Sequence, residues 1–389
     1  MGKSQEKRFM RIGIDATPAL VYPRTGVETY AFELVRTLIN EVHSHGDLQL
    51  YLYFHLANRF VRPSLLDELY LSGEQVHRRV YQFRRGYGLI LPLWAKWDGL
   101  NLLHMLLPRM PSTKSCATVF TVHDLVWAHL AGEEERREEH ADSEDSFRRT
   151  IASGDYFIAD SRSTARDLNH MCGIGPDKIQ VVHLGADHIH AGDRFDDNNS
   201  SAPMVKGTYI LYLGTIQYRK NLVRLAQAFC ILRRRYSIPH KLVLAGSNGN
   251  GHEMIYKAIN DLDHDDSILF LGYVSDAERQ ALYRGASLFV FPSLYEGFGF
   301  PVIEALSNGV SVVTSGTSSL PEVGGDLVLY CDPLSVEDIA KKMGTGLLDE
   351  TQRARVREEG PVWARNFSWQ RTAQETLSVY RYFVQHHRK

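Results

Sequence analysis

The sequence has few cysteines, no long apolar run and no excess of charge of either sign. Its four cysteines form no Cys-x-x-Cys pair, which argues against a zinc site or a redox motif, and their scarcity is typical of a reducing cytoplasm. Because no stretch of about 18 apolar residues occurs, we expect no membrane-spanning helix. Lysine and arginine total 44 and acidic residues 46, so the net charge of −2 argues against a nucleic-acid partner.

Short apolar runs alternate with helical patterns along most of the 389 residues. Few polar residues interrupt these runs, a pattern typical of parallel strands buried on both faces. The repeated order of strand and helix predicts an α/β fold with two Rossmann-like, doubly wound parallel-sheet domains facing a cleft. The expected strands are Met10–Asp15, Leu48–Phe54, Ala117–Val122, Tyr156–Ala159, Ile179–Leu184, Tyr209–Gly214, Lys241–Gly246, Ile268–Gly272, Ser287–Pro292, Val310–Thr314 and Leu327–Cys331.

A polar segment separates the two sets of strands. Residues 190–203 read HAGDRFDDNNSSAP, which is the composition of a linker. We therefore predict an amino-terminal domain over residues 1–195 and a second domain over residues 204–367, with a final helix, 368–389, returning to the first. Neither half has a Gly-x-Gly-x-x-Gly sequence after its first strand, so the usual dinucleotide fingerprint is missing.

The densest motif is residues 291–306, FPSLYEGFGFPVIEAL. An apolar strand ends here, and a loop with two glycines follows. We expect Pro301 to begin a helix, because proline is favoured at the first helical position. The free amides and dipole of a helix N-terminus suit a phosphate. Glu296 in the loop and Glu304, expected in the first helical turn, flank this N-terminus, where carboxylates are able to accept hydrogen bonds from sugar or ribose hydroxyls.

The Glu-x7-Glu spacing makes this motif resemble the signature of retaining glycosyltransferases of family 4, which have the GT-B architecture. Residues 209–229, 121–125, 159–163 and 315–322 resemble other landmarks of that family. The resemblance extends from residue 10 to residue 385. It implies an acceptor-side domain in the first half of the chain and a domain that binds a nucleotide sugar in the second.

The resemblance also implies roles for individual residues. Glu304 would hold the ribose hydroxyls and Glu296 the hydroxyls of the donor sugar. Lys220 and Arg219 would neutralise the diphosphate, whose negative charge grows as the glycosidic bond breaks. His123 would lie at the reacting centre. The other residues expected at the donor are Gly26, Val27, Thr215, Gly297, Phe298, Gly299 and Phe300.

One position departs from the family pattern. Many members have arginine directly after the glycine that ends the first strand of the second domain, whereas Thr215 follows Gly214 here. We therefore expect Arg219 to carry more of the phosphate charge. Since cationic side chains and amides suffice to hold the donor, we expect no metal and no cofactor.

The implied function is transfer of a hexose from a nucleotide sugar to a hydroxyl of a saccharide or lipid-linked saccharide, with retention, in polysaccharide, lipopolysaccharide or glycolipid synthesis. The sequence offers no clear nucleophile for a double displacement, which favours displacement on one face of the sugar. The loop from Gly214 to Asn221 is most similar to members that use GDP-mannose. The alternatives are UDP-glucose or UDP-N-acetylglucosamine as donor, a non-catalytic module that binds nucleotide sugars, and a phosphorylase or epimerase of the same layout.

Residues 76–97, VHRRVYQFRRGYGLILPLWAKW, combine basic side chains with aromatic and aliphatic ones. This composition suits a peripheral membrane contact or a polyprenyl-linked acceptor. The alternative is a core helix with a basic rim. We accordingly expect a cytoplasmic protein, with this segment as its means of association with the cytoplasmic face of a membrane.

Overall fold

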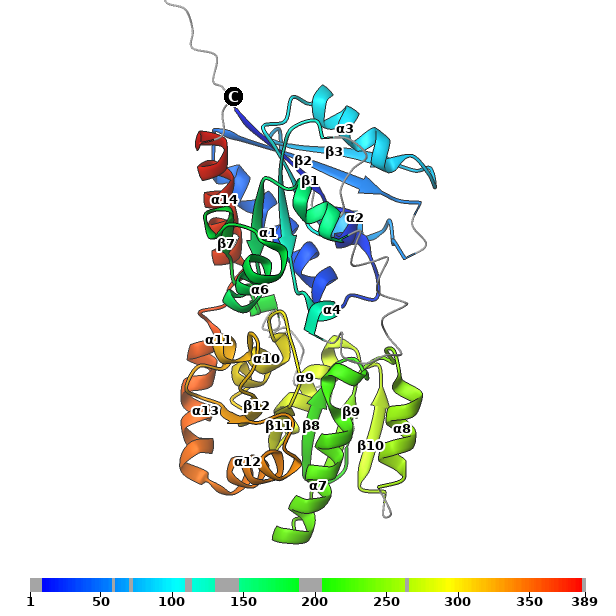
Figure 1. The fold of residues 1–389 in the computed structure, drawn as a ribbon, viewed down its shortest axis with the longest axis vertical. Coiled ribbons are helices and arrows are strands. Elements are labelled where there is room, and N and C mark those ends of the chain that lie inside the picture. Colours follow the sequence, from blue (N-terminus) through cyan, green and yellow to red (C-terminus); the bar gives the residue numbers. More distant parts are fainter. Residues whose placement is uncertain are drawn as a thin grey trace, which may run out of the picture. The chain divides into compact units, whose positions relative to one another are not determined.

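The computed structural model describes residues 9–57, 60–69, 73–108, 114–129, 147–188, 205–262 and 266–386. The chain divides into two compact units, Met1–Gly185 with Ser368–Lys389, and Ala186–Phe367. Each unit contains a parallel sheet with helices packed against it (Figure 1). The prediction of two Rossmann-like parallel-sheet domains is therefore confirmed. The predicted linker, residues 190–203, lies outside the described residues.

The first unit is built on seven parallel strands in the order β3-β2-β1-β4-β5-β6-β7. The strand order reverses between β1 and β4, which creates a switch point at the carboxyl edge of the sheet. The strands are β1 (Met10–Asp15), β2 (Leu48–His55), β3 (Val76–Tyr81), β4 (Leu102–Met105), β5 (Ala117–Val122), β6 (Tyr156–Ala159) and β7 (Ile179–Val181).

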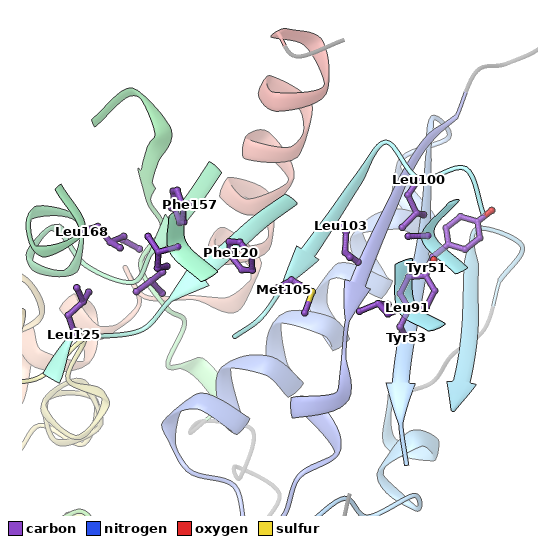
Figure 2. Packing of buried hydrophobic residues seen from close by; sticks show 14 residues of the cluster. Tyr51, Tyr53, Leu91, Leu100, Leu103, Met105, Phe120, Leu125, Phe157 and Leu168 are labelled. Carbon is purple, nitrogen blue, oxygen red and sulfur yellow. The ribbon is translucent and has the colours of Figure 1, made fainter. Parts of the chain in front are cut away.

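Helices cover both faces of this sheet. On one face, α3 (Tyr87–Trp97) and α6 (Arg162–Cys172) help to bury an apolar cluster that includes Tyr53, Phe120 and Phe157 (Figure 2). On the other face lie α1 (Gly26–Ser44) and α14 (Trp369–His386), which pack against each other. Other short helices of this unit are η1 (Thr17–Leu20), α2 (Leu65–Glu68), α4 (Val126–His129) and η3 (Pro176–Lys178).

The second unit is a sheet of six parallel strands in the order β10-β9-β8-β11-β12-β13, which reverses between β8 and β11. Its strands are β8 (Tyr209–Leu213), β9 (Lys241–Ala245), β10 (Ile268–Gly272), β11 (Leu288–Phe291), β12 (Val312–Ser315) and β13 (Leu329–Cys331). Its helices are η5 (Tyr218–Lys220), α7 (Leu222–Tyr236), α8 (His252–Asn260), α9 (Asp276–Gly285), α10 (Phe300–Ser307), α11 (Leu320–Gly324), α12 (Val336–Leu348) and α13 (Glu350–Ala364).

The segment 76–97 is not one helix. Residues Val76–Tyr81 form the edge strand β3, and Tyr87–Trp97 form α3 after a turn. Of the core helix with a basic rim that was the alternative, the structure has the part Tyr87–Trp97, whose Leu91 and Ala95 are buried in the core. Across the part of the chain that the structure describes, no helix has both the length and the apolar composition needed to cross a bilayer.

Candidate active site

The loops after β8 and β11 meet at the switch point of the second unit. The loop after β8 contains η5, which ends at Lys220, and Asn221 follows it with a φ of 62°. This left-handed conformation is one that asparagine tolerates better than most residues. The Asn221 side-chain amide donates to the carbonyl oxygens of Pro292, at 3.0 Å, and Pro333, at 2.6 Å. These bonds fix the basic residues beside the end of β11.

An ion cluster forms where these two loops meet. Lys220 Nζ lies 2.5 Å from Glu296 Oε1, and Arg219 Nη1 lies 2.6 Å from Glu296 Oε2. The Ser293 hydroxyl donates to the same Oε1 at 2.5 Å, and the Lys220 ammonium lies 4.7 Å from the centre of the Phe291 ring. Both Lys220 and Glu296 are buried. The structure thus brings together three of the four residues predicted to be catalytic.

The cluster holds Glu296 in its ionised form. Burial alone would raise the pKa of this carboxyl, but the charges of Arg219 and Lys220 and their hydrogen bonds lower the pKa to about 2. Arg219 Nη1 also donates to the carbonyl oxygen of Tyr295 at 3.0 Å, so the guanidinium is held by both the side chain and the backbone of the loop after β11. The ionised cluster has two positive charges and one negative charge, a balance that attracts a phosphate.

Acid is expected to weaken the second unit through this group. Because the folded pKa of Glu296, about 2, lies below its ordinary value of 4.5, the stabilisation is complete above pH 4.5 and is lost as the pH falls toward 2. The loss amounts to about 3 kcal/mol. Urea unfolding at several pH values in this range measures it. The Glu296→Gln variant should show a flatter profile, and an equally steep profile would contradict the assignment.

The loop between β11 and α10 contains the glycines of the motif. Gly299 has a φ of 126°, and a Cβ at this position would lie 3.0 Å from Leu320 and 3.1 Å from Val323, so both the backbone conformation and the packing favour glycine. Gly297 lies in the same loop, Phe300 is the first residue of α10, and Pro301 is the second, as the preference of proline for helix starts predicts.

Serines from the segment after β12 form hydrogen bonds with the backbone of this loop. The Ser318 hydroxyl accepts from the Glu296 amide at 3.0 Å. The Ser319 hydroxyl contacts the carbonyl oxygens of Glu296, at 2.9 Å, and Phe298, at 2.5 Å. The Phe298 ring is buried and packs edge-on against Phe300. Phe298 is therefore available to a ligand through its backbone rather than its ring.

Glu304 is the fifth residue of α10, so the expectation that it lies in the first turn is wrong. Its side chain is buried, with Oε2 accepting a hydrogen bond from Tyr283 at 2.8 Å and Oε1 lying 3.6 Å from Arg279 Nη1. Burial raises the pKa of Tyr283 well above its ordinary value, so the phenol remains a donor. Sequence reasoning missed Tyr283 and Arg279, both of which are carried by α9.

In the first unit, His123 follows β5 at the carboxyl edge of the sheet. Its Nδ1 lies 2.7 Å from Asp160 Oδ2, and its Nε2 lies 3.0 Å from the carbonyl oxygen of Leu106. The Tyr30 ring packs edge-on against the imidazole at 4.9 Å. Asp160 was not among the predicted site residues, although it lies in the segment 159–163 that resembles a family landmark.

Both ring nitrogens of His123 face acceptors, so the imidazole must be doubly protonated to donate to both. Burial lowers the pKa of His123. The Asp160 carboxylate and the Leu106 carbonyl raise the pKa by more than burial lowers it, so the net shift is upward. The second carboxylate oxygen of Asp160 is buried with no hydrogen-bond partner. The two acceptors therefore favour the doubly protonated imidazole, while burial also raises the pKa of its partner Asp160.

Replacing Asp160 with asparagine is expected to lower the pKa of His123 below its ordinary value, because burial then acts without the opposing carboxylate. Transfer should fall by about tenfold to a hundredfold, the effect of losing a charged hydrogen bond. NMR titration of the His123 ring measures the pKa directly. Asp177→Asn, at an exposed position in η3 of the same unit, is the matched control. An unchanged His123 pKa in the Asp160 variant would refute the pairing.

The remaining predicted donor residues lie at the carboxyl edge of their own sheets. Gly26 and Val27 open α1, preceded by Thr25, whose amide donates to Glu28 at 2.9 Å. Thr215 follows β8, and its carbonyl oxygen accepts from the Tyr212 hydroxyl at 3.1 Å. The amides of α1 and the Thr215 loop therefore have the positions from which backbone groups bind ligands in such sheets.

No cluster of three or more metal-ligating side chains occurs among the residues that the structure describes. Asp-x-Asp spacing, typical of manganese-bridged donors, does occur in residues 261–265, although 263–265 lie outside the described residues. Asp261, the one aspartate of this run that the structure describes, is the C-cap residue of α8. Our expectation of a metal-free donor site therefore rests on Arg219 and Lys220.

Comparison with known sequences decides the family. The profile described as Glycosyltransferase Family 4 matches residues 24–189, and the profile described as Glycosyl transferases group 1 matches residues 193–363. The chain belongs to glycosyltransferase family 4. This family-4 glycosyltransferase is 28% identical to O-antigen chain mannosyltransferase B of Escherichia coli over 390 residues, which cover 95% of this chain and 99% of that protein.

A second relative matches a shorter part of the chain. The serotype-specific mannosyltransferase WbdA of Escherichia coli is 32% identical over 211 residues, which cover 54% of this glycosyltransferase and 25% of WbdA. Solved structures share the GT-B fold. Sucrose-phosphate synthase from Thermosynechococcus elongatus superposes with a TM-score of 0.70 at 17% identity, covering 97% of this chain and 99% of that one. Anabaena HepE in complex with UDP and glucose gives 0.67 at 16%, covering 96% and 100%.

Proposed function

We propose that this glycosyltransferase moves a mannose from GDP-mannose to a hydroxyl of a saccharide or lipid-linked saccharide, with retention, in the synthesis of a surface polysaccharide. The observation that carries the proposal is the buried cluster at the switch point, in which Glu296 pairs with Lys220 and Arg219. Mannose as the sugar is supported by the relatives named as mannosyltransferases, one of which matches nearly the full length.

The proposed reaction takes place on one face of the sugar. The acceptor oxygen forms a bond to the anomeric carbon while the bond from that carbon to the diphosphate breaks, and the acceptor proton passes to the leaving phosphate oxygen. Lys220 and Arg219 stabilise the charge that develops on the diphosphate. Glu296 accepts hydrogen bonds from the sugar hydroxyls, and Glu304 accepts them from the ribose, held in place by Tyr283.

In the first unit, the proposal places His123 at the reacting centre as a cation near the hydroxyls of the donor sugar, while its two N–H groups stay on Asp160 and the Leu106 carbonyl oxygen. The amides of Gly26 and Val27 contact the phosphate, and the loop residues Thr215 and Gly297 line the donor. A cytoplasmic location is part of the proposal, since all four cysteines are free thiols.

A thermal-shift screen with GDP-, UDP- and dTDP-sugars tests the donor. Binding at a hundred times Kd stabilises the fold by about 2.7 kcal/mol, so the true donor raises the melting temperature while its competitors do not. A response to UDP-glucose or UDP-N-acetylglucosamine alone would replace GDP-mannose as donor. Binding without transfer or slow donor hydrolysis would indicate a non-catalytic module. Sugar release that needs phosphate but no nucleotide would indicate a phosphorylase.

A further inference from the structure

The helix α3 has an apolar stripe that its packing does not explain. Leu91 and Ala95 on one side are buried in the cluster against the sheet. Leu89, Leu93 and Trp97 recur at every fourth position, and their exposed fractions are 63%, 61% and 85%. Phe83, just before the helix, is 72% exposed. These four apolar side chains, which we call the α3 face, are Phe83, Leu89, Leu93 and Trp97.

The same segment has charge of one sign. Residues 76–97 contain five lysines and arginines and no acidic residue. Arg79 pairs with the buried carboxylate of Asp98, with Nη2 2.5 Å from Oδ1, and so serves the fold. The other four basic side chains are exposed, and they are Arg78, Arg84, Arg85 and Lys96.

This combination fits a lipid surface. Tryptophan and phenylalanine favour the boundary between headgroups and acyl chains, leucine favours the apolar side of it, and arginine and lysine bind anionic headgroups. The helix lies beside β3, the edge strand of the sheet, which leaves its outer side open to such a surface (Figure 1). A symmetric contact between two copies through this face would instead oppose like charges.

We propose that the α3 face docks this glycosyltransferase on an anionic lipid bilayer. The apolar side chains enter the boundary of the acyl chains while the exposed arginines and Lys96 contact the headgroups. The helix has 11 residues and lies on the membrane rather than crossing it. This inference concerns the first unit and does not depend on the identity of the donor.

Vesicle flotation at about 0.15 M salt tests the inference. We expect the full chain to float with vesicles of phosphatidylcholine and phosphatidylglycerol, and to remain in solution with phosphatidylcholine alone. The double variant Arg84→Gln/Arg85→Gln should weaken binding by about 25-fold, since each cation contributes about fivefold. Leu93→Ser/Trp97→Ser should weaken it by more than about tenfold.

Matched controls come from the second unit. Met254 and Leu348 are similarly exposed, at 74% and 59%, so Met254→Ser/Leu348→Ser controls for the loss of surface apolar groups. Arg234→Gln/Arg284→Gln controls for the loss of exposed cations. Both control proteins should float as the unmodified chain does. All variants should keep the donor-induced thermal shift, so that a failed donor site and a failed membrane site give different results.

Three outcomes would overturn the inference. The first is an unmodified chain that does not float with anionic vesicles or floats equally with neutral ones. The second is a set of α3 variants that bind as the controls do. The third is light scattering in which Leu93→Ser/Trp97→Ser turns a dimer into a monomer without changing flotation, which would assign the face to a second copy of the chain.

Discussion

Replacing Glu296 with glutamine is expected to reduce transfer by about a thousandfold. The variant removes the carboxylate proposed to bind the sugar hydroxyls, and it also frees Lys220 and Arg219, which contact the two oxygens of that carboxylate at 2.5 and 2.6 Å. Misplaced cations would stabilise the leaving diphosphate poorly in the transition state. Transfer from radiolabelled donor measures the effect.

The same variant is expected to lose about 3 kcal/mol of unfolding free energy, because Lys220 stays buried without its anion. Glu253→Gln, at an exposed position on α8, is the matched control and should leave both quantities unchanged. Stability lost with transfer intact would make Glu296 a purely structural residue. Undiminished values of both would remove Glu296 from the account.

Replacing Lys220 with methionine is expected to lower kcat by about a hundredfold to a thousandfold. Methionine keeps the length and the contact with the Phe291 ring but removes the charge that faces the diphosphate. Because that charge is needed most in the transition state, kcat should fall more than KM rises. Steady-state kinetics over a range of donor concentrations separates the two parameters.

Lys257→Met is the matched control, since Lys257 is exposed on α8 of the same unit. Lys220→Arg should recover part of the rate, because it restores the charge with a different shape. A Lys220→Met protein whose donor affinity falls while its kcat is unchanged would place the lysine in ground-state binding alone, contrary to the proposed role.

Strands were predictable from the sequence where their residues are apolar without interruption. The runs in β1, β5, β6 and β10 have the predicted bounds. The strand β3 was missed because it reads VHRRVY and lies at the edge of its sheet, where basic side chains reach solvent. The strand β4 was missed because the polar His104 interrupts its apolar sequence LLHM.

His104 illustrates why such a strand escapes sequence reasoning. It is fully buried, with Nδ1 2.6 Å from the Tyr380 hydroxyl and Nε2 2.8 Å from Thr121 Oγ1. Burial lowers its pKa to about 3, so it is neutral. Its partner Tyr380 is supplied by α14, far away in the sequence. The residues next to His104 in the sequence do not reveal that distant residues form hydrogen bonds with both of its ring nitrogens.

The residues of the candidate site also differ in how far the sequence alone points to them. Glu296 and Glu304 belong to one continuous motif, so the local sequence was enough to propose both as site residues. Residues that orient them come from other segments, as Tyr283 does from α9 and Asp160 from the end of β6. These segments come together only because of the order of the strands in each sheet. That order is not evident from a single sequence.

A crystal structure with the donor bound tests the central claim most directly. The account predicts phosphate oxygens within hydrogen-bond distance of Lys220 and Arg219, a sugar hydroxyl on Glu296 and the ribose hydroxyls on Glu304. Donor density elsewhere on the chain, or none at a saturating concentration, would contradict it.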